Sequence, residues 1–165
     1  MNELLKPLGL TQLARALPTV LQEAREQQLS YEASHDALTG LDNRRAFLEG
    51  LRSSTAPEAR GTVLFCDLDR FKPVNDRHGH TVGDRLLVVV GERLQSAVRP
   101  TDLVARYGGD EFTVFCPGLV DEAEVAGLVD RLRRAISLPV SIGDLTVEVG
   151  ITVGVSPVHS ADDAD

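Results

Sequence analysis

Acidic side chains stand at the ends of two segments that the sequence predicts to be β-strands. Asp67 and Asp69 lie at the C-terminal end of the apolar run 62–68. Asp110 and Glu111 follow a pair of glycines at the turn of a predicted hairpin. Carboxylates brought together repel each other and need a proton, a cation or a basic partner. A hard divalent cation such as Mg²⁺, held by one or two carboxylates and substrate phosphates, meets that need.

These acidic residues could instead be solvated strand ends. For Asp69 that alternative is as good as a role in metal binding. For Asp67, Asp110 and Glu111 the adjoining glycine turn favours the metal site, because glycines let a backbone approach a ligand closely. Two divalent ions held close together can activate an attacking hydroxyl and stabilise a leaving phosphate.

The elements that would position these residues follow from hydrophobic periodicity and turn signals. From Gly61 onward the patterns predict a strand over 62–68, a loop with one helical turn over 71–80, a helix over 82–98, a hairpin of strands 102–107 and 110–115, a helix opened by Asp121 with an apolar stripe to Ile136, a short strand at 138–142 and a strand over 145–156. This β-α-β-β-α-β order predicts an α+β, ferredoxin-like fold with an antiparallel central sheet and helices on one face. Such a fold does not by itself define a function.

The composition narrows the class of protein. Of the 165 residues 42% are hydrophobic, enough for a sizeable core. Seventeen Lys and Arg against 25 Asp and Glu give a net charge of −8, which argues against a nucleic-acid duplex or an anionic membrane as the main partner. No apolar run approaches the roughly 20 residues that span a bilayer, and the first residues lack the pattern of a secretory signal. We therefore expect a cytoplasmic globular domain without membrane insertion in this chain.

Two cysteines, Cys66 and Cys116, are too few for a disulfide scaffold or a four-cysteine zinc site. We expect them to be buried free thiols in neighbouring strands.

The first 33 residues differ from the rest and predict a separate N-terminal linker or signalling helix. Leucines at 10, 13 and 17 have a heptad-like spacing, but Pro7 and Pro18 interrupt a continuous helix. The segment could pack on its own domain or dimerise ahead of it. The expected domains are therefore 1–33 and 34–165.

Several spaced motifs together resemble one known family. They are RYGGDEF at 106–112, DALTGL at 36–41, NRR at 43–45, FCDLD at 65–69, FK at 71–72, VND at 74–76, GH at 79–80, GD at 83–84 and a late glycine at 154. Over about residues 33–156 the chain is similar to the GGDEF domain family, the diguanylate cyclases.

The resemblance implies a reaction. Members of the family condense two GTP molecules into cyclic di-GMP and release two pyrophosphates. Each protomer of a homodimer presents one GTP, and the two 3′-hydroxyls attack each other's α-phosphates. The family uses Mg²⁺ or Mn²⁺, two per active site. In-line phosphoryl transfer of this kind depends mostly on positioning and charge neutralisation.

The resemblance also assigns roles by position. Asp67, Asp110 and the Leu68 carbonyl correspond to the metal ligands. Asp110 and Glu111 are the expected catalytic residues, and Glu111 would assist either the metal site or deprotonation of the 3′-hydroxyl. The expected substrate-binding residues are Asn75 and Asp84 at guanine, Lys72 with the backbone N–H groups of Arg70 and Phe71 at phosphate, His80 at the nucleotide pocket, and Gly108 and Gly109.

Each of these positions has a plainer alternative. Asp84 lies close to the predicted start of a helix and could cap it. Asn75 could cap a turn, Lys72 could be a surface lysine, and His78 and His80 could be loop histidines. An Asp that accepts from N1–H and the 2-amino group of guanine would repel N1 of adenine, which argues against ATP as the substrate.

A second site is implied by Arg99 and Asp102. In the family an R-x-x-D pair just before the signature forms an inhibitory site for cyclic di-GMP, and here the pair falls in that register. Arg can clamp phosphate or stack on guanine, and Asp accepts guanine donors. The alternative is a surface ion pair at a helix end.

One departure from the family leaves two classes of function open. Members usually continue into a further helix that carries a Lys and an Arg toward the triphosphate, and nothing in 157–165 matches that segment. The expected function is a diguanylate cyclase with product feedback inhibition. The alternative is a catalytically silent module that senses cyclic di-GMP or GTP.

Overall fold

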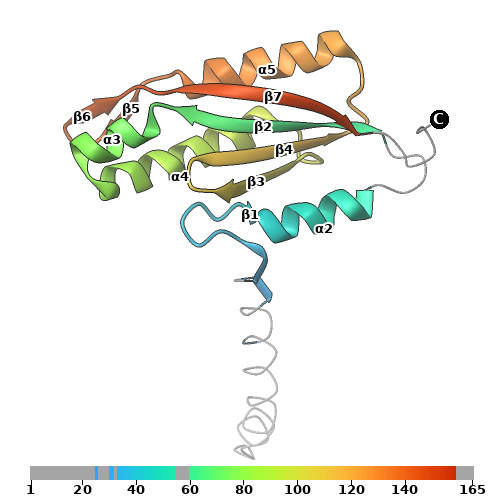
Figure 1. Cartoon of the computed structure of the whole chain (residues 1–165), viewed down its shortest axis with the longest axis horizontal. Helices are drawn as coiled ribbons and strands as arrows, with labels where there is room; N and C mark the ends of the chain where they lie inside the picture. The colour runs from blue at the N-terminus through green and yellow to red at the C-terminus, as the bar shows by residue number, and fades with distance from the viewer. Residues whose placement is uncertain (1–24, 26–29, 32, 55–59, 159–165) are drawn as a thin grey trace, which may run out of the picture. The chain divides into compact units, whose positions relative to one another are not determined.

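A computed structural model of the chain describes residues 25, 30–31, 33–54 and 60–158 (Figure 1). The chain divides into two compact units, 1–34 and 35–165, and the described helices and sheets discussed below belong to the second. The predicted N-terminal helix falls almost entirely outside the described residues. No helix in the described part of the chain is long and apolar enough to cross a membrane.

The second unit is built on a five-stranded sheet with the strand order β1-β3-β4-β2-β7. The long strands pair antiparallel, and only the short β1 runs parallel to its neighbour. The strands are β1 (Asp42–Asn43), β2 (Gly61–Asp69), β3 (Leu103–Gly108), β4 (Glu111–Pro117) and β7 (Gly150–Val158), with β5 (Val140–Ile142) and β6 (Leu145–Val147) forming a separate hairpin. The predicted ferredoxin-like fold with an antiparallel sheet is confirmed.

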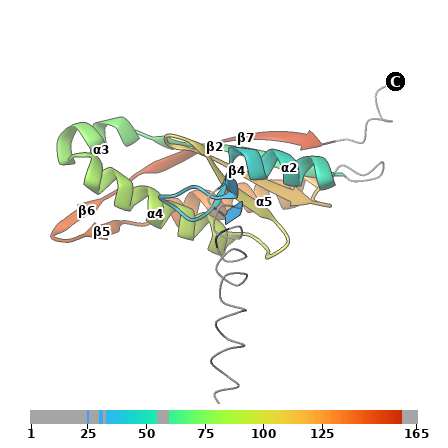
Figure 2. The same ribbon diagram turned by 90° about the horizontal axis from the view of Figure 1, so that it is seen from below.

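Helices cover both faces of this sheet, whereas the sequence predicted them on one face only. One face packs against α3 (Phe71–His78), α4 (His80–Ala97) and α5 (Glu122–Ile136) to form the main core. The two predicted long helices are confirmed, and each buries an apolar face: Leu86, Val90 and Leu94 of α4 and Leu128 and Leu132 of α5 are buried. Figures 1 and 2 show the long strands running past α4 and α5.

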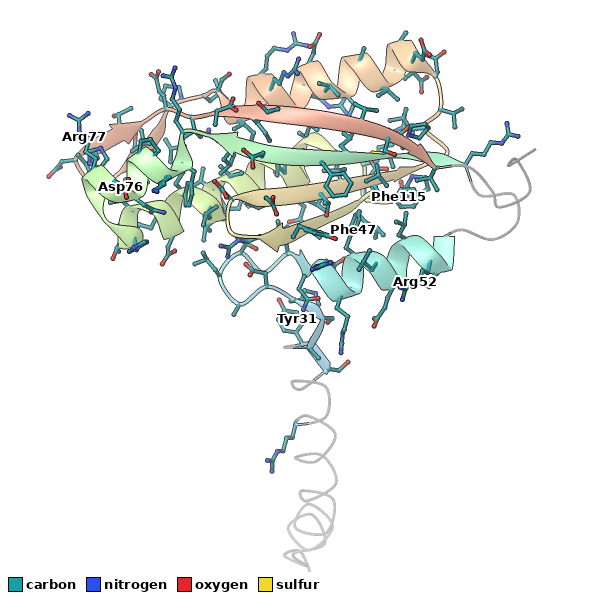
Figure 3. All side chains as sticks on the ribbon, viewed as in Figure 1. Tyr31, Phe47, Arg52, Asp76, Arg77 and Phe115 are labelled. Atoms are coloured by element: carbon teal, nitrogen blue, oxygen red, sulfur yellow. The ribbon has the colours of Figure 1, made fainter. Side chains whose placement is uncertain are left out.

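The opposite face carries a smaller core under α2 (Arg44–Ser54). Phe47 of α2 and Phe115 of β4 are its largest members and lie between that helix and the sheet (Figure 3). Alternate residues of one strand serve the two cores, as the pleat requires: Leu64 belongs to the main core and Val63 to the smaller one. This alternation leaves Phe65 and Asp67 on the face of α2.

Two predictions of elements were wrong. The segment predicted as a loop with one turn is a full helix, α3. Pro73 is tolerated there because it occupies the first helical turn. The single strand predicted over 145–156 is divided into β6 and β7, and Gly143, with φ 61°, provides the turn that folds β6 back onto β5.

Candidate active site

The acidic residues predicted to form a metal site lie at one end of the paired strands β2 and β4. In the antiparallel register Asp67 stands directly opposite Glu111. The backbone N–H of Leu68 donates to the backbone oxygen of Asp110 at 3.3 Å. The end of β2 and the turn before β4 are therefore in direct contact, and the structure brings Asp67, Leu68, Asp110 and Glu111 together.

Asp69, which the sequence left undecided, has a structural partner. The hydroxyl of Thr152 on β7 donates to Asp69 Oδ1 at 2.7 Å. The same carboxylate also fills the space beside Gly150, where a Cβ would lie 2.5 Å from Asp69 Oδ2. This residue joins β2 to the edge strand, whereas the side chain of Asp67 has no hydrogen bond or ion pair within the described part of the chain.

A hollow of about 310 Å³ adjoins the acidic residues on the face of α2. Its lining residues come from four neighbouring strands and include Phe65, Asp67, Tyr107, Glu111 and Thr152. Two carboxylates thus face a space large enough for part of a nucleotide.

The donor set suits a hard cation. Asp67, Asp110 and the Leu68 carbonyl offer only oxygen atoms, and Mg²⁺ takes one or two carboxylates together with water and phosphate oxygens. Among the described residues no group of three or more His, Cys, Asp or Glu side chains is gathered as a ready-made metal cage. The residues present therefore fit an ion whose coordination is completed by a bound phosphate.

The predicted nucleotide-binding residues lie on the helical corner after β2. Arg70 adopts a left-handed conformation, with φ 61°, between β2 and α3. Lys72 and Asn75 lie on α3, and His80 and Asp84 on α4. Gly79, with φ 82°, joins the two helices, and its N–H donates to the backbone oxygen of Asn75 at 2.8 Å.

The alternative roles for two of these residues find no support. No side-chain hydrogen bond caps α4, and Asp84 lies beyond its first turn. The Asn75 Oδ1 atom is buried without a hydrogen-bond partner, so this amide does not cap a turn. Lys72, Asp84 and His80 are exposed, as ligand-binding side chains at a rim would be.

The glycine turn is held by a residue to which the sequence gave no role. Arg106 donates from Nε and Nη2 to the backbone oxygen of Gly109, at 3.0 and 2.8 Å. Its Nη1 reaches both oxygens of Asp36, at 3.1 and 3.3 Å. Asp36 in turn accepts from the N–H and hydroxyl of Thr39. Arg106 and Asp36 both belong to motifs quoted from the sequence, but only the folded structure shows that their side chains are in contact.

The same contacts set the ionisation of Asp36. Burial favours the neutral form, but the hydrogen bonds from Thr39 and the positive charge of Arg106 outweigh it. Together they hold the pKa of Asp36 below its usual value. The Arg106 side chain is 14% exposed and that of Asp36 23%, so this ion pair is shielded from solvent.

The sequence also gave no role to the aromatic residues beside the acidic edge, the group of Asp67, Asp110 and Glu111. The rings of Phe65 and Tyr107 meet edge to face with centroids 5.8 Å apart. The guanidinium of Arg44 lies 4.7 Å from the centroid of Tyr107. Phe65 remains 49% exposed, so this group forms an open wall of the hollow.

The predicted inhibitory residues lie in a second hollow of about 290 Å³. Arg99 and Asp102 line it together with Cys116, Glu124 and Arg131, and the last two come from α5. The Arg99 backbone N–H donates to Asp102 Oδ2 at 2.8 Å, and no ion pair between the two side chains is recorded in the described part of the chain. A surface ion pair therefore does not describe this site. Arg131 could not be found from the R-x-x-D spacing because α5 supplies it.

Both thiols are buried and free, as predicted, and their strands β2 and β4 are neighbours. Burial raises the pKa of the Cys66 thiol to about 12. Burial and the carboxylate of Asp102 raise the pKa of the Cys116 thiol to about 12. Neither thiol is a nucleophile near neutral pH.

The fold and the site together define an α+β domain whose acidic strand ends suit a divalent cation with a phosphate ligand. The model of the family described as "Diguanylate cyclase, GGDEF domain" matches residues 33–165. The chain belongs to this family.

Two curated relatives show the range of proteins that contain such a domain. Diguanylate cyclase TpbB from Pseudomonas aeruginosa (strain UCBPP-PA14) is 40% identical over 140 residues, which are 80% of this chain and 32% of that protein. Cyclic di-GMP phosphodiesterase NbdA from P. aeruginosa PAO1 is 40% identical over 128 residues, which are 75% of this chain and 16% of that protein. The chain thus spans about a third or less of the length of these relatives.

Solved structures show the same fold. Diguanylate cyclase SiaD of P. aeruginosa, in complex with its activator SiaC, superposes with a TM-score of 0.72 and 31% identity, covering 92% of this chain and 61% of that one. The GGDEF domain of TpbB (YfiN) from P. aeruginosa gives 0.67 and 39%, covering 74% of each chain. The coiled coil and GGDEF domain of DgcB from Caulobacter crescentus, in complex with c-di-GMP, gives 0.77 at 23% identity, covering 91% and 83%, and supports the fold alone.

Proposed function

We propose that the chain is a diguanylate cyclase domain that condenses two GTP molecules into cyclic di-GMP and two pyrophosphates. The observation that carries the proposal is the meeting of Asp67, Asp110 and Glu111 at one end of β2 and β4. Family membership and the similarity to diguanylate cyclases support it. Because GTP is an intracellular substrate, the proposal places this domain in the cytoplasm.

The metal site would be formed by the carboxylates of Asp67 and Asp110 and the carbonyl of Leu68. Mg²⁺ or Mn²⁺, two per active site, would supply charge neutralisation of the phosphates and a lower pKa for the attacking 3′-hydroxyl. Glu111, which stands opposite Asp67, either supports the metal site or accepts the hydroxyl proton. Arg106 holds the Gly108-Gly109 turn in place, so that its backbone can approach the nucleotide.

The base and the phosphates would be bound by the helical corner. The backbone N–H groups of Arg70 and Phe71 stand at the N-terminus of α3, where the helix favours anions. Lys72 adds a positive charge, and His80 lines the pocket. Asn75 and Asp84 select guanine, because a carboxylate accepts from N1–H and the 2-amino group, which adenine does not offer.

Two further features complete the proposal. Condensation needs two GTP molecules face to face, so the active form is a homodimer with one nucleotide per protomer. Product feedback acts through Arg99 and Asp102, whose hollow shares no lining residue with the hollow beside Asp67 and Glu111. The cation of Arg131 in the same hollow supports an anionic ligand there, while Glu124 offers an acceptor for base donors.

A silent module that only binds cyclic di-GMP is the second candidate. The observation that favours it is the hollow at Arg99 and Asp102, which would bind the dinucleotide whether or not the acidic edge turns over GTP. The relative NbdA, a phosphodiesterase by name, shows that this domain also occurs in proteins named for another activity.

The deciding experiment incubates the chain with GTP and Mg²⁺ and separates the nucleotides by chromatography, with calorimetry of cyclic di-GMP binding on the same sample. Cyclic di-GMP and pyrophosphate formed together establish the cyclase, and ATP in place of GTP should give no product. Tight cyclic di-GMP binding without any turnover establishes the binding module instead.

A further inference from the structure

Gly83, near the start of α4, packs directly against the side chain of Asn75 on α3. A methyl group at Gly83 would overlap Asn75 Oδ1. It would also lie 2.9 Å from Asn75 Cγ and 3.2 Å from Phe71 Cζ. These are closer approaches than ordinary side chains make, so the missing side chain of Gly83 is the space in which the amide of Asn75 rests.

Backbone conformation does not explain the glycine. Gly79 at the corner has φ 82°, but Gly83 is not among the described glycines with positive φ and lies inside a regular helix. Glycine is less favourable than alanine inside a helix. The close approach of α3 and α4 is therefore the only described feature that calls for glycine at this position.

The contact also orients the amide of Asn75. Its Oδ1 is buried against α4 without a hydrogen-bond partner, and Nδ2 is not among the buried atoms that lack one. The group left for a ligand is therefore the NH₂, a donor. A donor at Asn75 and an acceptor at the neighbouring Asp84 match the O6 or N7 acceptors of guanine together with its N1–H and 2-amino donors.

We propose that Gly83 is a positioning residue for base selection: it admits the Asn75 amide between α3 and α4, turns its NH₂ toward the nucleotide and sets its distance from Asp84. This inference rests on the proposed function, because it concerns the same guanine site. Gly83 itself touches no substrate and acts through Asn75.

The test is a double-mutant cycle of Gly83→Ala and Asn75→Ala in the full chain. The ligand is 3′-deoxy-GTP with Mg²⁺, which lacks the attacking hydroxyl and is not consumed. Gly83→Ala should weaken its binding about tenfold, the loss expected when one or two hydrogen bonds to the base are displaced. In the Asn75→Ala background the same change should cause no further loss.

The melting temperature gives a second readout of the same cycle. Gly83→Ala should lower it when Asn75 is present, because the methyl group forces the amide out of its place. In the Asn75→Ala background Gly83→Ala should raise it, because alanine favours the helix and the overlap is gone. The contact with Phe71 is present in both backgrounds, so the change of sign reports Asn75.

The outcomes separate the two levels of the proposal. If the wild-type chain binds no 3′-deoxy-GTP, the proposed function fails. If the wild-type chain binds it but the effects of the two substitutions on affinity are additive, or Gly83→Ala binds as well as wild type, then guanine binding stands and the role of Gly83 is wrong.

Discussion

Asp67 and Asp69 show at the scale of the residue how neighbours decide what a carboxylate does. Both end the same strand, and the sequence offered metal binding and solvation for each. Asp69 is held by Thr152 from a strand that begins 81 residues later, and this pairing has no local signal. Asp67 stands opposite Glu111 instead, through the antiparallel pairing of β2 with β4. The acidic cluster was therefore predictable, but the separate role of Asp69 was not.

Replacing Asp110 tests the acidic edge. Asp110→Asn should reduce cyclic di-GMP formation at least about 100-fold, because a neutral amide neutralises neither the metal nor the transferred phosphate. The melting temperature should stay close to wild type, since the side chain of Asp110 has no hydrogen-bond or ion-pair partner among the residues that the structure describes. Product is measured by chromatography. Asp144→Asn, at the β5–β6 turn, is the matched control and should keep full activity.

The two cysteines give a prediction that depends on burial rather than catalysis. Because burial raises the pKa of both thiols to about 12, almost no thiolate exists at pH 8. The folded chain should react with a thiol-specific reagent at least about 100-fold more slowly than the chain unfolded in urea. Reaction of either thiol at the rate of the unfolded chain would contradict the burial of β2 and β4.

At the scale of the element, the predicted strands and long helices were right where the hydrophobic pattern is strong. The helix α3 was missed because Pro73, Asn75 and Gly79 are turn-forming residues, and its two buried residues, Phe71 and Val74, are too few for a periodic stripe. The single late strand was wrong because a run of alternating residues does not reveal where it leaves one sheet for another.

The ion pair of Asp36 and Arg106 ties the segment before β1 to the hairpin of β3 and β4. Asp36→Asn should lower the free energy of unfolding near neutral pH by about 1–3 kcal/mol, because Arg106 loses a partly buried, charged partner. It should also raise the KM for GTP, because Arg106 positions the glycine turn. Urea denaturation and initial rates measure the two effects.

The pH dependence of this pair has a definite sign. The pKa of Asp36 is lowered in the folded chain, so its contribution to stability is fully present above the ordinary value of 3.8 and is lost as pH falls through the folded pKa. Wild type and Asp36→Asn should therefore differ in stability at pH 5 to 7 and converge as the pH falls from 3.8 through the lowered pKa of Asp36. A constant difference down to pH 2 would contradict the ion pair.

At the scale of the whole molecule, β3 joins two separate sites. The acidic edge lies beyond its end at Gly108, and the Arg99–Asp102 hollow precedes its start at Leu103. The strand itself spans about 17 Å. Apart from α3 and the division of the late strand, the order of elements after Gly61 was predictable from the sequence. So were the pairs Asp67 with Asp110 and Arg99 with Asp102, whereas the α5 residues of the second hollow could be found only from the tertiary fold.

The second site gives a prediction about feedback. Arg99→Ala should leave the initial rate of product formation unchanged, because Arg99 and the acidic edge lie beyond opposite ends of β3. Added cyclic di-GMP should then inhibit at least about tenfold less strongly, since a charge-assisted contact to phosphate is lost. Inhibition curves with added cyclic di-GMP measure this. An unchanged curve would show that the hollow is not the inhibitory site.

The last prediction concerns the number of chains that act together. In the proposed function one chain supplies one acidic edge and one helical corner, which would bind one GTP, whereas the condensation joins two GTP molecules. The rate should therefore rise with the square of the protein concentration when the chain is dilute, and specific activity should fall on dilution until a dimer no longer forms. Binding of 3′-deoxy-GTP per chain should stay constant over the same range, because each protomer binds its own nucleotide.

Specific activity that does not change over a thousandfold dilution, while GTP is still converted, would show either that the dimer is far tighter than the range tested or that one chain suffices. Light scattering at the lowest active concentration separates these two, and a monomer that still forms cyclic di-GMP would overturn condensation between two protomers.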